Sequence, residues 1–147
     1  MQKNVFSLER VLNFRREAEK LRKIEFAVAK REFELAEDKL RREEEAIEKL
    51  NLEFMGRQLE GIGALELQLY SDFFQMKKQD ITQQREEVSV LDRTRLEKQD
   101  TLLEAATDKK IMEELKKQKV LAHEKVLAEK ERNFLDEIAL RSRGQDL

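Results

Sequence analysis

Three of the four glycines lie within one eight-residue window of a chain that contains no proline. They are Gly56, Gly61 and Gly63. A glycine inside a helix lowers its stability by about 1 kcal/mol relative to alanine, so a long helix ends most readily in this window. The sequence therefore predicts a turn at about residues 59–63 between two helical segments.

The composition also favours long helices over a compact globule. Of 147 residues, 42% are charged and only 6% are aromatic, which is too little bulk for a large core. The charges nearly balance, with 30 basic and 32 acidic residues, and this argues against disorder driven by repulsion. The absence of cysteine excludes disulfides, and no run of about 18 apolar residues could cross a membrane. We predict a soluble, cytoplasmic protein.

Apolar residues before the glycines repeat every seven positions, which is the pattern of a coiled coil. The series is Phe26, Phe33, Leu40, Ile47 and Phe54, with Ala29, Ala36 and Leu50 three positions after its members. Glu43 and Arg57 interrupt the companion series. Upstream, a second set in another phase predicts a local adjustment of the supercoil between about residues 21 and 26; it consists of Val11, Phe14, Ala18 and Leu21.

After the glycines the seven-residue pattern resumes at Leu67, Phe74, Ile81 and Val88, diluted by polar residues such as Lys77 and Gln84. A short connection between two such helices favours an antiparallel pair. We predict an all-α fold: one elongated antiparallel coiled-coil hairpin over residues 1–147, with helix one at about 7–58 and a longer helix two at about 64–141. The last ~25 residues of helix two would then have no partner helix.

Two groups of apolar residues exceed what the hairpin interface can bury. The first lies on the unpaired end of helix two and predicts contact with another protein; its members are Leu121, Leu127, Phe134, Leu135 and Ile138. The second lies near the turn and comprises Leu69, Phe73 and Met76, opposite Leu52, Met55, Leu59 and Ile62. Either this second group forms a small core that closes the hairpin, or Leu69, Phe73 and Met76 form an exposed docking patch.

No motif indicates catalysis, a metal or a cofactor. The spacing of Gly56 and Gly61 matches a phosphate-binding loop, but Ile62 and Gly63 stand where lysine and a hydroxyl residue are required. His123 is the only histidine, and without cysteine it cannot build a conventional zinc site. We therefore predict a protein that is not an enzyme and that has no small-molecule substrate. A net charge of −2 argues against nucleic-acid binding.

Three segments of the chain resemble the FliJ family, the soluble coiled-coil proteins of the flagellar type III export apparatus. They are FSLERVLNFRREAE at the N-terminus, LQLYSDFFQMKKQDI after the glycines, and EKERNFLDEIALRSR near the C-terminus. The most specific pieces are Phe6, Leu8, Val11 and Leu12 together with LDEIA at residues 135–139. The resemblance covers almost the whole chain.

This resemblance implies a central stalk that binds the hexameric export ATPase, the export-gate membrane protein and substrate chaperones, without chemistry of its own. It implies a cytoplasmic protein peripherally associated with the inner membrane at the flagellar base, and a monomer when alone. On this interpretation the ATPase ring contacts the apolar end of helix two together with Val5, Leu8 and Leu12, while Leu69, Phe73 and Met76 contact the gate. The alternatives are the equivalent injectisome stalk, a self-associating coiled-coil scaffold and a general export chaperone.

Overall fold

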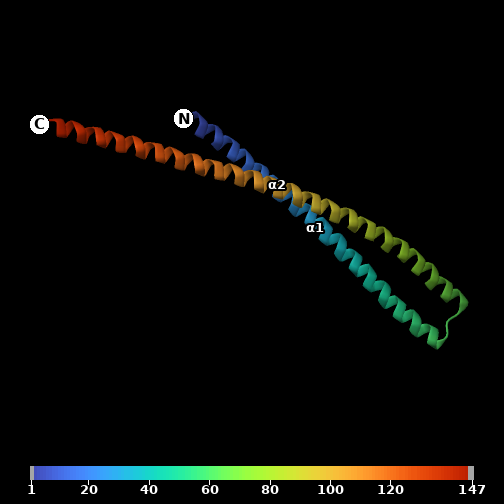
Figure 1. Cartoon of the computed structure of the whole chain (residues 1–147). Helices are drawn as coiled ribbons and strands as arrows, with labels where there is room; N and C mark the ends of the chain where they lie inside the picture. Colours follow the sequence, from blue (N-terminus) through green and yellow to red (C-terminus); the bar gives the residue numbers. More distant parts are fainter. Residues whose placement is uncertain (1, 146–147) are drawn as a thin grey trace. The chain divides into compact units, whose positions relative to one another are not determined.

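The chain folds into two long α-helices that lie antiparallel and in contact. The computed structural model describes the backbone of residues 2–145 and the side chains of residues 7–144. Helix α1 runs over Gln2–Glu60 and helix α2 over Ala64–Gln145, with 59 and 82 residues, and the described residues contain no strand (Figure 1). The predicted all-α hairpin with a longer second helix is confirmed, although both helices extend a few residues beyond their predicted ends.

The connection between the helices uses two of the three clustered glycines. Gly61 has a φ of 98°, in the left-handed region, and its backbone N–H donates to the carbonyl of Gln58 at 3.4 Å. The carbonyl of Gly63 accepts a 3.0 Å hydrogen bond from the N–H of Leu67, which starts α2. Gly56 lies inside α1, in agreement with the predicted end of helix one at about residue 58.

Contacts divide the chain into two units, each containing a part of both helices. The first comprises Met1–Leu21 and Leu103–Leu147, and the second is Arg22–Leu102. In the second unit an aromatic cluster holds the helices together near the loop. The ring centroid of Phe54 lies 4.9 Å from that of Tyr70 and 5.6 Å from that of Phe74. Farther from the loop, Ala29 and Ile81 are buried.

Polar residues that interrupt the apolar pattern of the second unit find partners on the opposite helix. Lys77 Nζ donates to Glu43 Oε2 at 2.9 Å, so two interrupting residues satisfy one another. The guanidinium of Arg95 lies 4.9 Å from the ring centroid of Phe33. Arg57 pairs with Glu66 across the loop end. These pairs keep the two helices in register where apolar side chains are missing.

The first unit is held mainly by charged residues around one buried leucine. Leu12 is 1% exposed, and about two helical turns later the carboxylate of Glu19, which is also buried, forms an ion pair with Lys109 at 2.7 Å. Arg15 pairs with Asp108 at 3.2 Å, and Glu9 with Lys116 at 2.5 Å. Glu9 pairs with Lys116, whereas Glu19, later in α1, pairs with Lys109, which comes earlier in α2, as an antiparallel pair requires.

The predicted change of phase near residue 21 is wrong. Phe14 and Leu21 are 67% and 53% exposed, whereas Leu12 and Glu19 occupy the buried positions at intervals of seven before Phe26. The interface therefore keeps one heptad phase along α1. In the first unit this phase combines the apolar Leu12 with Arg15 and Glu19, which form ion pairs with α2, whereas Phe14 and Leu21 lie on the outer face.

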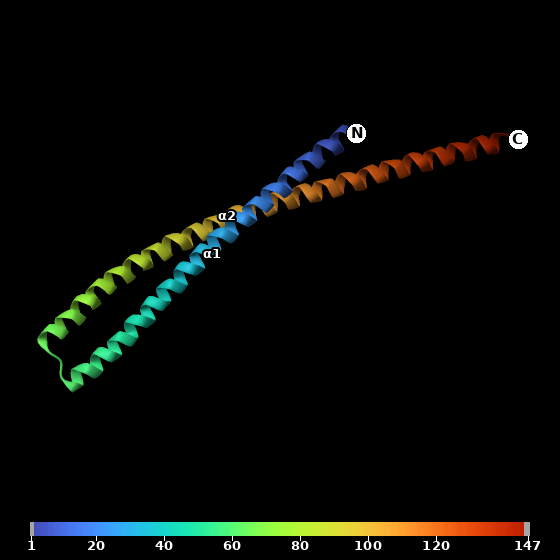
Figure 2. The ribbon, with the colours of Figure 1, turned by 180° about the vertical axis from the view of Figure 1, so that it is seen from behind.

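Residues 117–144 of α2, which we name the C-terminal arm, follow the last ion pair described between the helices. A groove shared with side chains of α1 is lined by only four of them: Lys117, Val120, Leu121 and Glu124. All side chains of the arm are exposed. The last interhelical ion pair before the arm joins Lys116 to Glu9. Figures 1 and 2 show the arm in orange and red, continuing as a single helix in both views.

Candidate functional site

The C-terminal arm presents a row of large apolar side chains to solvent. Leu127 and Phe134 are 51% and 61% exposed and lie seven residues apart, so both occupy one helical face. The other three predicted members, Leu121, Leu135 and Ile138, are also exposed. Val120, Val126 and Leu140 extend this surface beyond the predicted set. A helix meant to stand alone in water is normally polar on all sides, so this arrangement suits a protein partner.

The predicted N-terminal members of this site whose side chains the structure describes, Leu8 and Leu12, are not exposed in the way that the apolar side chains of the arm are. Val5 lies outside the described side chains. Leu8 is half-buried, and Leu12 is the most buried side chain of those described. Because Leu12 already packs against α2, it can touch a partner only if residues 7–21 separate from that helix.

A shallow groove joins Leu12 to the beginning of the arm. Its lining includes Leu12 and Arg16 from α1 and Lys116, Val120 and Leu121 from α2. The apolar side chains of Val120 and Leu121 therefore continue the buried contact of Leu12 out onto the exposed arm. This groove lies wholly within the first unit.

The loop-end patch comprises Leu69, Phe73 and Met76 on α2. These side chains are 64%, 40% and 51% exposed, so they do not form the small closing core; Phe54, Tyr70 and Phe74 close the hairpin instead. Lys77 Nζ lies 5.7 Å from the ring centroid of Phe73.

Sequence reasoning missed Leu65 as a member of the loop-end patch. Leu65 is 82% exposed and lies four residues before Leu69, on the same side of the helix. The i, i+4 spacing alone would have found it. The patch thus begins within the first turn of α2.

Ion pairs in and around the helix interface shift the pKa values of Glu9, Glu25 and Lys109. The hydrogen bond from Lys116 holds the pKa of Glu9 below its usual value, and Arg22 does the same for Glu25, with a weaker contribution from Lys98. The hydrogen bond that Lys109 donates to Glu19 raises the pKa of Lys109. These groups stay charged at neutral pH and stabilise the interface.

The described part of the chain contains no cluster of metal-ligating side chains. His123 lies exposed on the C-terminal arm. Neither helix, over residues 2–145, has an apolar stretch that could cross a membrane.

Comparison with known proteins identifies the family of the chain. The family model of the flagellar FliJ protein matches residues 3–145, nearly the full length. Neither a curated protein nor a solved structure matches the chain. The chain therefore belongs to the flagellar FliJ protein family.

Proposed function

We propose that this protein is a non-enzymatic central stalk of the flagellar export apparatus, and that its C-terminal arm binds the hexameric export ATPase. The observation that carries the proposal is the exposure of five large apolar side chains on the C-terminal arm. The family places the chain in flagellar export. A ring of subunits around such a helix would cover this apolar surface and so gain binding free energy.

A stalk of this kind acts by binding, without a chemical step. It binds one arrangement of the ATPase subunits more tightly than the others, and this difference favours ring assembly and ATP turnover. The arm serves this role because Leu127, Phe134 and Ile138 recur along one helix and can meet different subunits at different depths.

We assign the loop-end patch to the export-gate membrane protein. Leu69, Phe73 and Met76 are exposed in the second unit, whereas the arm belongs to the first, so each surface can be altered without changing the other. Substrate chaperones complete the proposed set of partners. The site of action is the cytoplasmic face of the inner membrane at the flagellar base, and the protein is a monomer before it meets the ring.

The test is native mass spectrometry of the cognate export ATPase mixed with this protein in the presence of a non-hydrolysable nucleotide. The expected complex contains six ATPase subunits and one copy of this chain. The double substitution Leu127→Ser and Phe134→Ser removes the added mass, whereas Val90→Ser with Leu96→Ser, two exposed apolar residues of α2 outside the arm, does not. A dimer of this chain that the arm substitutions abolish would instead support the self-associating scaffold.

A further inference from the structure

A third apolar surface lies on α1 just before the loop. Leu52, Met55, Gly56 and Leu59 follow the i, i+3, i+4, i+7 spacing of one helical face, which we name the Leu52 face. Leu52 and Met55 are 66% and 55% exposed, and Leu59 is 90% exposed. The contacts of this stretch with α2 use Phe54 instead, so the Leu52 face is turned away from α2.

Gly56 lies at the centre of this face, and nothing within the chain explains a glycine there. Gly61 is the only described residue with a positive φ, so Gly56 has no conformational need to lack a side chain. A Cβ atom added at Gly56 would meet no atom within 4 Å, so packing within the chain does not require glycine either. A glycine in a helix interior is destabilising, but it lets another backbone approach the helix closely.

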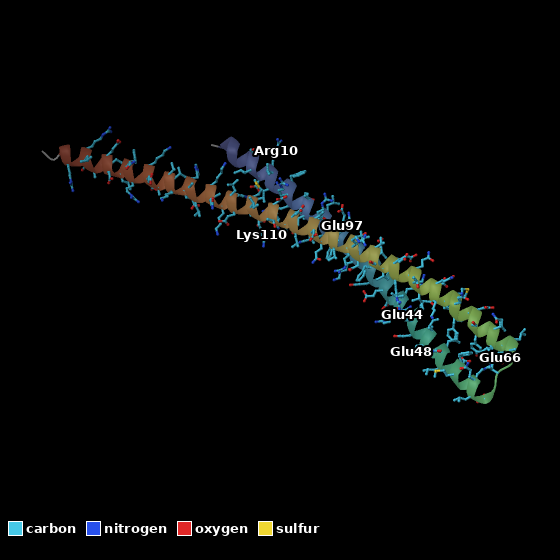
Figure 3. All side chains as sticks on the ribbon, turned by 45° about the vertical axis from the view of Figure 1, so that its right-hand side comes forward. Arg10, Glu44, Glu48, Glu66, Glu97 and Lys110 are labelled. Carbon is cyan, nitrogen blue, oxygen red and sulfur yellow. The ribbon has the colours of Figure 1, made fainter. Side chains whose placement is uncertain are left out.

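The charges around the Leu52 face indicate what approaches it. Glu53 and Glu60 lie three residues before and four residues after Gly56, and Glu48, which Figure 3 labels, lies one turn before Leu52. None of these three carboxylates belongs to an ion pair among the described residues. Arg57 forms an ion pair with Glu66 and also interacts electrostatically with Glu53, and Lys49 lies on the same stretch of helix, so the described charges of this stretch remain mainly acidic.

We propose that the Leu52 face binds an amphipathic helix of another protein, whose apolar stripe is flanked by lysine or arginine side chains. The apolar stripe covers Leu52, Met55 and Leu59, and the gap at Gly56 admits a close helix–helix contact. The basic flanks meet Glu48, Glu53 and Glu60. This surface lies on a different helix from the loop-end patch and is additional to the proposed contacts with ATPase and gate.

The test uses the full chain and three synthetic helical peptides of about six turns. The first carries a leucine stripe with lysine flanks, the second the same stripe with glutamate flanks, and the third the first composition in scrambled order. Fluorescence anisotropy measures binding at two salt concentrations, and hydrogen exchange locates the protected amides. The lysine-flanked peptide should bind at least tenfold more tightly than the other two, bind less tightly at high salt, and protect residues 48–60.

Two variants and their controls decide whether the Leu52 face is responsible. Gly56→Gln fills the gap and should weaken binding at least tenfold while keeping α1 helical, whereas Ala27→Gln, at an exposed position of the same helix, should not. Leu52→Ser with Leu59→Ser should abolish binding, and Leu35→Ser should leave it unchanged. Three results would each overturn the proposal. The first is equal binding by all variants, and the second is protection from hydrogen exchange that is confined to residues 65–76. The third is a dimer of this chain that Gly56→Gln dissociates. If the protein fails to bind the export ATPase, the proposed stalk function is contradicted, but the result of this peptide-binding test is unaffected.

Discussion

Lys109 Nζ lies 2.7 Å from Oε2 of the buried carboxylate of Glu19, and this ion pair occupies an interface position where a coiled coil normally places an apolar residue. Removing one partner of such a pair takes away the ion pair that stabilises the buried charge, whereas replacing both partners by apolar residues is often neutral or stabilising. Lys109→Met should therefore lower the melting temperature, and Glu19→Leu with Lys109→Met should restore or raise it. Thermal unfolding by circular dichroism measures both, and a double variant no more stable than Lys109→Met would contradict the prediction.

Acid should weaken the paired region. The pKa of Glu9 and that of Glu25 are lowered in the folded chain, so their stabilisation is present above the ordinary glutamate value of about 4.5 and is lost as pH falls through the lowered values. The raised pKa of Lys109 keeps that residue charged throughout this range. The melting temperature should fall between about pH 5 and pH 3. Glu9→Gln should be less stable at pH 7 and show a smaller decrease; an unchanged pH dependence would refute the role of Glu9.

The aromatic cluster should carry much of the stability near the loop. Phe54 contacts the rings of both Tyr70 and Phe74, and Phe54→Ala should cost about 2 kcal/mol through lost packing. Phe14→Ala, at a residue that is 67% exposed, should change stability by less than about 0.5 kcal/mol. Urea unfolding measures both changes, and equal effects would contradict the assigned interface.

Substitution by alanine should change the stability of the chain in opposite directions at Gly56 and at Gly61. Gly56→Ala should stabilise the chain by about 1 kcal/mol, because the position is helical and open. Gly61→Ala should destabilise by about 1 kcal/mol, because its φ of 98° strains any residue with a Cβ. Urea unfolding gives both values, and a destabilising Gly56→Ala would place a structural requirement at Gly56.

The glycine window and the seven-residue repeat were sufficient to predict the two helices and the loop. The series from Phe26 to Phe54 gave the correct face of α1 because its members are apolar: Phe54 packs against Tyr70 and Phe74, and Phe33 lies against the guanidinium of Arg95. Gly61 and Gly63 end and begin helices as such residues commonly do. Local signals therefore determined the fold class.

The interface of the first unit could not be predicted from one helix. Arg15 and Glu19 look like surface residues in the sequence, and only the position of Asp108 and Lys109 on the other helix makes them interface residues. For the same reason Phe14 and Leu21 were assigned to the interface although they are exposed. The arm was predictable because it depends only on the difference in helix length, whereas the burial of Leu12 depends on how the charged residues around it pair.

The most direct test of the stalk is steady-state ATP hydrolysis by the cognate export ATPase over a range of concentrations of this protein. Wild type should stimulate hydrolysis, and Leu127→Ser with Phe134→Ser should need at least tenfold more protein for half-maximal stimulation, the loss expected when two large apolar contacts are removed. The control Val90→Ser with Leu96→Ser should match wild type. The proposed stalk function would be contradicted if wild type neither bound the ATPase nor stimulated it. Full stimulation by the arm variant would contradict the assigned role of the C-terminal arm.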